Sequence, residues 1–140
     1  MIRTEQAEIL LPAMPRGLHL ITAAVEEVLR QWNTGSGVLH VFLKHTSAGI
    51  CINENYDPSV RHDLERALDL LAPENAPYYT HTLEGPDDMP AHIKAMLSGV
   101  SLHIPVTDGR LNLGTWQGIY LCEFRNRGGR RKLVVTYTGK

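Results

Sequence analysis

The sequence lacks any run of about 18 consecutive apolar residues, so we expect no transmembrane helix. It also lacks an excess of charge of one sign, because 14 basic and 15 acidic residues leave a formal net charge of -1. A nearly neutral chain has no overall field that attracts nucleic acid or an anionic membrane. The N-terminus, MIRTEQAEIL, has no apolar signal-peptide core, so we expect a cytoplasmic protein.

Cysteine is scarce, with only Cys51 and Cys122 in the chain. Both lie in apolar, strand-like runs and lack the spacing of metal ligands, so we expect them to be small core side chains. The length of 140 residues and the hydrophobic content of 43% fit one domain, 1–140, with one sizeable core. We find no internal repeat and no linker.

The hydrophobic periodicity predicts both strands and helices. Helices are predicted over 22–32, from Pro58 with Asp57 as N-cap, and from Pro90 to the C-terminal Gly99. The second helix has a stripe that we expect to be buried, formed by Val60, Leu64, Ala67, Leu68 and Leu71. Strands are predicted over 2–11, 38–44, 48–53, 100–106, 110–113, 119–124 and 132–138.

The order of these elements favours an α+β fold with a largely antiparallel sheet over a wound parallel sheet. The links late in the chain are short and hairpin-like. In particular, a Gly-Gly turn at 128–129 joins the last two predicted strands.

Among seven histidines, His45, His81 and His92 stand out. His45 ends a strand and is followed by small residues, and strand ends commonly carry functional sites. His81 precedes the acidic turn LEGPDD, and His92 falls in the first turn of the third helix. The helix dipole disfavours a charged imidazole there, and a metal needs the neutral ring.

The segment 81–92 has three interpretations. Paired imidazoles with a carboxylate suit zinc or another transition ion. Glu84, Asp87 and Asp88 alone suit magnesium, which takes carboxylate oxygens and phosphates. Alternatively, Asp87 and Asp88 only cap the helix that begins near Pro90.

Three further stretches offer binding groups. Trp116 in GTWQG either walls a pocket or fills the core at a strand bend. The segment NENYDP, 53–58, is either a simple turn and cap or an anion site before a helix. The basic stretch 125–132 either binds phosphate or forms a solvated hairpin tip.

These segments together resemble the YjbQ-like family of small bacterial and archaeal proteins. The motifs that carry the resemblance are HTSAGICINENYDPSVRHDLE (45–65), HTLEGPDDMPAHIKAMLSGVSLHIPV (81–106), GRLNLGTWQGIYLCEFR (109–125) and GGRRKLVVTYTG (128–139). The resemblance implies an α+β sandwich of largely antiparallel sheets with about three helices, assembled as a homotrimer. It also implies one pocket, lined by the HTSA, NEN-x-DP, acidic-histidine and TWQ segments, within a chain or at a subunit boundary.

The resemblance also implies roles for individual residues. A divalent metal, zinc or magnesium, is expected at His45, His81 and His92. Catalytic roles are expected for Asp87, Asp57 and Asn53. Residues expected to bind a small phosphorylated substrate are Thr46, Ser47, Trp116, Gln117, Arg110 and Arg130.

The activity that the resemblance implies is a weak, secondary thiamine phosphate synthase activity. That reaction joins a pyrimidine diphosphate to a thiazole phosphate and releases pyrophosphate. Two alternatives stay open: a metal-dependent hydrolase of a small phosphorylated or cyclic metabolite, and a non-catalytic trimeric metabolite-binding protein. The sequence has no evident diphosphate cradle, which fits a side activity better than an optimised synthase.

Overall fold

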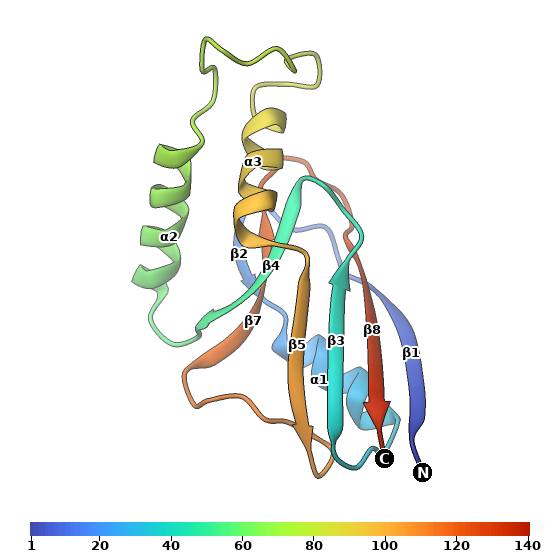
Figure 1. Ribbon diagram of the computed structural model, residues 1–140. Helices are drawn as coiled ribbons and strands as arrows, with labels where there is room; N and C mark the ends of the chain where they lie inside the picture. Colours follow the sequence, from blue (N-terminus) through green and yellow to red (C-terminus); the bar gives the residue numbers. More distant parts are fainter.

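The computed structural model describes residues 1–140 and contains two antiparallel sheets and three helices (Figure 1). This confirms the predicted α+β class. The elements in chain order are β1 (Arg3–Leu10), β2 (Gly17–Leu20), α1 (Thr22–Gln31), β3 (Gly37–Leu43), β4 (Ala48–Glu54), α2 (Pro58–Leu71), α3 (Asp88–Ser98), β5 (Ser101–Thr107), β6 (Arg110–Leu111), β7 (Gln117–Glu123) and β8 (Lys132–Gly139). The four-residue strand β2 is too short to give a sequence pattern, and the sequence did not predict it.

The two sheets pack on each other, and the central strand of the smaller one, β7, is buried on both faces. The five-stranded sheet has the order β1-β8-β3-β5-β6, and the three-stranded sheet has the order β2-β7-β4. In β7, Ile119 and Leu121 belong to the core between the sheets, whereas Tyr120 and Cys122 pack with residues of α3. Burial on both faces explains why the stretch IYLCEF is apolar without alternation.

The core between the sheets follows the two-residue period of the strands. In β3, Leu39 and Val41 are fully buried, while the alternating Val38 and Phe42 are exposed on the outer face. Helix α1 adds Val25 to the same core. The outer face of the five-stranded sheet therefore carries apolar side chains that no other element of the chain covers.

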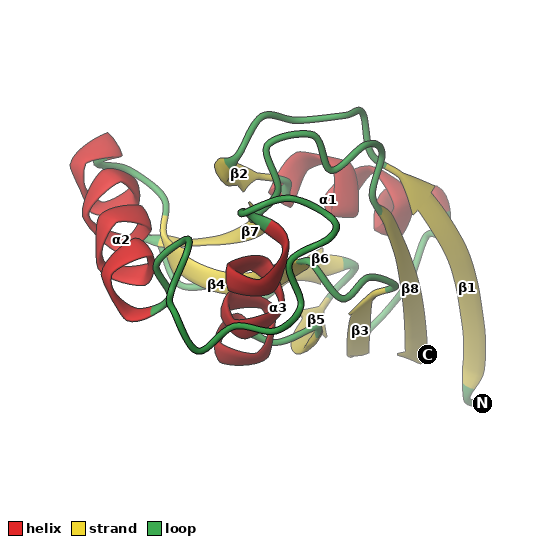
Figure 2. Cartoon of the chain, turned by 90° about the horizontal axis from the view of Figure 1, so that it is seen from above, coloured by secondary structure: helices red, strands yellow, loops and turns green.

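Helix α2 differs from its prediction. Asp57 caps it as expected, by accepting a hydrogen bond from the Ser59 amide at 2.9 Å. However, the predicted buried stripe is wrong, because no residue of α2 is buried and Leu71 is exposed. Figure 2 shows the reason: α2 lies on the outside of the molecule, on the side of α3. None of the three helices has the length and apolarity that crossing a membrane would require.

The hairpin expected around the Gly-Gly turn does not form. Strand β7 belongs to the three-stranded sheet, whereas β8 pairs with β1 and β3 in the other sheet. The connecting segment therefore crosses between the sheets. A bidentate ion pair joins its ends, with Arg131 Nε 2.8 Å from Glu123 Oε1 and Arg131 Nη2 2.6 Å from Glu123 Oε2. This buried pair takes the place of backbone pairing between the two strands.

The two cysteines meet on the α3 side of the small sheet. Their sulfur atoms are 3.7 Å apart, with Cys122 buried and Cys51 half-buried, and both thiols are free. The hydrogen bond between them lowers the pKa of Cys51 and raises that of Cys122, whose burial adds to the effect. The prediction that both cysteines are core side chains is therefore confirmed for Cys122, whereas Cys51 is only half-buried.

The alternation in β3 predicts very different costs for two neighbouring truncations. Leu39→Ala leaves a cavity in the core and should lower the free energy of unfolding by about 2–5 kcal/mol. Val38→Ala, at a side chain that is 44% exposed, should cost less than about 1 kcal/mol. Urea unfolding measures both, and equal losses would contradict the assignment of the inner face.

Candidate metal centre

The loop before α3 and the first turns of that helix bring three polar side chains together. Asp88 and His92 are four residues apart and therefore share one face of α3. The loop places His81 Nε2 2.6 Å from Asp88 Oδ2, and His92 Nε2 lies 3.0 Å from the same oxygen. The three potential ligand atoms all lie within 4.8 Å of one another. We call these three residues the His-Asp-His cluster.

The other ring nitrogen of His92 determines what the cluster can bind. His92 Nδ1 lies 2.8 Å from the carbonyl oxygen of Thr46, which can only accept, so Nδ1 carries the proton. In a neutral ring, Nε2 then directs its lone pair at the Asp88 carboxylate. Two acceptors 3.0 Å apart repel each other, so either a second proton on His92 or a metal cation stabilises this arrangement. A carbonyl that orients a histidine in this way is typical of metal sites.

Arg125 holds the second carboxylate oxygen of the cluster. Its Nη1 lies 2.6 Å from Asp88 Oδ1, and its Nε lies 2.9 Å from Asp87 Oδ2. The Asn126 amide also donates to Asp87 Oδ2, at 2.9 Å. Neither aspartate caps α3 through its side chain, so the capping interpretation is wrong. Asp87 instead positions Arg125, and Arg125 leaves Asp88 Oδ2 directed at the histidines.

These contacts keep both carboxylates ionised. Burial raises the pKa of Asp88, but the hydrogen bond from His81 and the charges of His92 and Arg125 outweigh it, and the net pKa is lowered. Burial likewise opposes ionisation of Asp87, while the Asn126 amide and Arg125 lower its pKa overall. The cluster therefore presents a carboxylate at neutral pH, which is the form that a cation requires.

His45 does not join the cluster, which is a correction to the predicted ligand set. Its Nε2 accepts a hydrogen bond from the Lys132 amide at 2.8 Å. Burial and the neighbouring charge of Arg131 lower the pKa of His45, so the ring is neutral. Asp88, and not His45, is the third group that lies beside His81 and His92. The hydrogen bond of His45 ties β8 to the loop 45–47.

The buried ion pair between Glu123 and Arg131 also fixes the loop 45–47. Arg131 Nη2 donates to the carbonyl oxygen of Ser47 at 3.2 Å and to its Oγ at 3.1 Å. Ser47 is therefore a structural contact, and Thr46 enters the site through its carbonyl rather than its hydroxyl. A cavity of about 190 Å³ adjoins the cluster, with His81, Tyr79 and Met89 among its lining residues.

The predicted residues at 53–57 and 116–117 lie at the other end of the small sheet. Strand β4 begins beside Ser47 and runs seven residues, about 20 Å, before Asn53 and Asp57 follow. Asn53 accepts from its neighbouring amide at 2.8 Å. Trp116 is 59% exposed and packs edge-on against Tyr56. Within one chain these segments do not meet in one pocket, so a pocket at a subunit boundary stays a prediction.

The remaining predicted residues are also distant from the cluster or already engaged. Gln117 accepts from the Gly114 amide at 2.8 Å. Arg130 donates to the carbonyl oxygens of Leu11 and Leu10, at 3.0 and 3.2 Å. Arg110 lies on the β5–β6 hairpin at the bottom of Figure 1, whereas the N-terminus of α3 is at the top.

The sequence interpretations considered Asp88 as a magnesium ligand beside Glu84 and Asp87 or as a helix cap, not as a ligand beside the two histidines, and they named Arg125 only as part of the basic stretch 125–132. The Asp-x3-His spacing on a helix was the available signal for Asp88. Arg125 had no such signal, because it stands in a basic stretch where several arginines look equivalent.

The comparisons with known proteins agree with the fold. The family model of the UPF0047 protein YjbQ-like family matches residues 7–140. This chain belongs to the YjbQ-like family. The UPF0047 protein YjbQ of Salmonella typhimurium is 50% identical over 136 residues, covering 96% of this chain and 98% of that protein.

Archaeal relatives and solved structures of the YjbQ-like family extend the match. A UPF0047 protein of Methanocaldococcus jannaschii is 43% identical, with 99% of this chain and 91% of that protein covered. The crystal structure of a YjbQ/UPF0047 protein of Clostridium acetobutylicum is 39% identical, with a TM-score of 0.82 and coverage of 95% and 99%. A YbjQ-like protein of unknown function from Sulfolobus solfataricus, 24% identical with full coverage of both chains, shares the fold at a TM-score of 0.90.

The lowered pKa values at the cluster predict acid-sensitive stability. The unfolded state binds more protons than the folded state as the pH falls below about 4, so the stabilisation present at higher pH is lost there. Asp87→Asn should lower the free energy of unfolding at pH 7 by about 1–3 kcal/mol and should flatten its decline toward pH 3. Asp63→Asn, at an exposed position of α2, is the control and should change neither.

Urea unfolding at a series of pH values between 3 and 7 provides the measurement. If Asp87→Asn kept the full slope of the parent protein, the carboxylate would not be stabilised by Arg125 as the geometry indicates.

Proposed function

We propose that the His-Asp-His cluster binds a divalent metal and that the protein uses it on small phosphorylated substrates. The observation that carries this proposal is the convergence of His81 Nε2 and His92 Nε2 on Asp88 Oδ2, at 2.6 and 3.0 Å, with His92 Nδ1 held by the Thr46 carbonyl. Two imidazoles and one carboxylate are a donor set that suits zinc better than magnesium. Three protein ligands also leave a coordination position for water or substrate, as in catalytic zinc sites.

The proposed reaction is the thiamine-phosphate-synthase-like transfer, as a secondary activity. In it, the thiazole nitrogen forms a bond to the methylene carbon of the pyrimidine, and the bond from that carbon to the diphosphate oxygen breaks. When bound, the metal would neutralise charge that develops on the leaving pyrophosphate. Arg125 and Asp87 hold Asp88 in place, and the cavity beside His81 has room for only part of a substrate.

A metal-dependent hydrolase is the second candidate, and the positions of the arginines favour it. Arg110 lies far from the cluster, and Arg130 is engaged with backbone carbonyls. One chain therefore offers no evident cradle for a diphosphate and a second phosphate together. A hydrolase needs to bind only water and a single phosphorylated group, which requires fewer cationic side chains at the site. A non-catalytic metabolite-binding role is the third candidate.

Metal titration is the first test of the cluster. We expect His81→Ala and His92→Ala each to weaken Zn²⁺ binding by about 100-fold or more, because each removes one of three ligands. His62→Ala, an exposed histidine on α2, is the matched control and should bind like the parent protein. Isothermal titration calorimetry and metal content of the purified proteins are the readouts. Retained Zn²⁺ affinity in the His81→Ala/His92→Ala double variant would overturn the site.

Turnover assays then separate the candidate reactions. The zinc-loaded protein is incubated with the pyrimidine diphosphate, with and without the thiazole phosphate. Pyrophosphate release that requires the thiazole supports the transferase, whereas release without it supports the hydrolase. Zinc binding with no turnover on a wide panel of phosphorylated compounds would support the binding protein. Activity that persists in the metal-free double variant would refute the metal role.

We further propose a homotrimer, as the family resemblance implies. Large apolar side chains stand exposed on α2 and the loop after it, among them Leu70, Leu71, Tyr78 and Leu83. A second copy of the chain would remove this surface from water. Sedimentation equilibrium should give three times the chain mass of 15.6 kDa, and a monomeric mass at micromolar concentration would contradict the proposal.

A further inference from the structure

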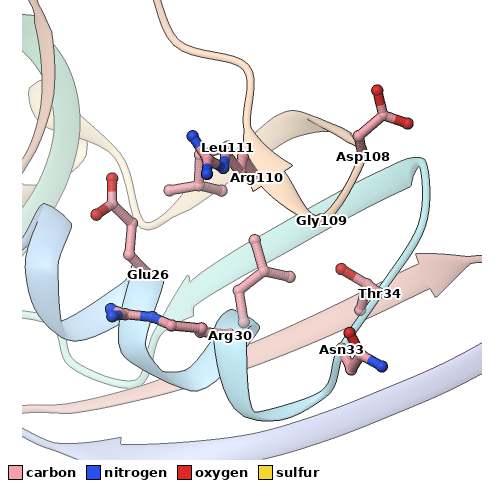
Figure 3. Close-up of a pocket in the computed structure, with 9 residues that line it drawn as sticks. Glu26, Arg30, Asn33, Thr34, Asp108, Gly109, Arg110 and Leu111 are labelled. Atoms are coloured by element: carbon pink, nitrogen blue, oxygen red, sulfur yellow. The ribbon is translucent and has the colours of Figure 1, made fainter.

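A cavity of about 560 Å³ lies at the end of the molecule opposite to the His-Asp-His cluster (Figure 3). The second half of α1, residues 33–34 and the hairpin residues 108–111 line it. Its volume falls in the range of sites that hold small molecules. The sequence singled out only Arg110 in this region, and the proposed function does not use the cavity.

Two guanidinium groups at this cavity are available to a ligand. Arg110 makes no ion pair and no side-chain hydrogen bond within the chain. Arg30 pairs only with Glu27, at 3.0 Å, and both side chains are largely exposed. An exposed pair of this kind contributes little and yields easily to a better partner. Figure 3 shows Arg30 and Arg110 on the same side of the cavity, with Glu26 near them.

The other side of the cavity carries acceptors. Figure 3 shows Asp108, Asn33 and Thr34 there. Thr34 Oγ1 is buried and has no hydrogen-bond partner, although buried hydroxyls are almost always paired. A ligand with a hydrogen-bonding group at this point would satisfy it. The hairpin holds this wall in place, because the Asp108 amide donates to Ser36 Oγ at 3.1 Å.

The charges of the lining residues indicate the class of ligand. Glu26 and Asp108 balance Arg30 and Arg110, so the lining has no net charge. A diphosphate or another polyanion would leave its charge uncompensated, whereas a zwitterion of matching polarity would not. Leu111, a half-buried side chain of the hairpin, adds an apolar surface to the lining.

We propose that this cavity binds a small zwitterion of the free amino acid class. The carboxylate lies at Arg30 and Arg110, the ammonium group at Asp108 and Thr34, and an apolar side chain against Leu111. The site is separate from the His-Asp-His cluster, so neither proposal depends on the other.

Thermal unfolding with matched probes tests the class of ligand. The probes are L-leucine, L-methionine and L-phenylalanine, together with N-acetyl-L-leucine, which lacks the ammonium, L-leucinamide, which lacks the carboxylate, and inorganic phosphate. We expect at least one free amino acid to raise Tm with saturation at millimolar concentration, and the other three probes to have no saturable effect. Equal binding of N-acetyl-L-leucine or phosphate would overturn the proposal, and so would no response to any amino acid.

Variants locate the binding in this cavity. Arg110→Ala and Asp108→Asn should each weaken the amino acid by about tenfold or more in calorimetry. Asparagine tolerates the positive φ of 50° at position 108, so the turn is retained. Arg66→Ala, at an exposed arginine on α2, is the control and should bind normally. Unchanged affinity in both cavity variants would place the ligand elsewhere and overturn the assignment.

Discussion

The buried ion pair between Glu123 and Arg131 is the interaction on which the rest of the site depends. It joins the end of β7 to the start of β8 where the chain passes from one sheet to the other, and no backbone ladder holds that junction. The same guanidinium binds Ser47 and so fixes the loop that carries the Thr46 carbonyl. Removing one partner of such a pair leaves an uncompensated buried charge, which costs about 3–5 kcal/mol.

The position of the loop 45–47 determines how the side chains of the His-Asp-His cluster are oriented. The Thr46 carbonyl keeps a proton on His92 Nδ1, and the ring then turns Nε2 toward Asp88. Arg125 occupies the second oxygen of Asp88 and is itself held by Asp87. Four polar contacts therefore position one carboxylate oxygen between two imidazoles. Either a metal cation or a second proton on His92 stabilises this arrangement.

The two ends of the molecule differ in the electrostatics they offer. The cluster end concentrates histidine and carboxylate groups around a small cavity, which suits a cation and its bound water or phosphate. The opposite end has a larger cavity whose arginines and acids balance, which suits a net-neutral ligand. Because strand β5 separates α3 from the hairpin that forms the second cavity, ligands could occupy both ends at once (Figure 1).

The sequence by itself determined the elements and the candidate segment. Alternation in 38–44, the Asp57-Pro58 start of α2 and the motifs around 81–92 all act locally, through hydrogen bonding, backbone sterics and burial of one face. These local rules therefore predicted the α+β class and two of the three residues of the cluster, His81 and His92.

Only the tertiary structure decided which distant groups meet. The choice of Asp88 over His45, the crossing of β7 and β8 into different sheets and the separation of Trp116 from the cluster all depend on sheet order. Sheet order results from packing two sheets and a helix layer around shared core residues. That packing is a property of the whole chain, and no spacing along the sequence encodes it.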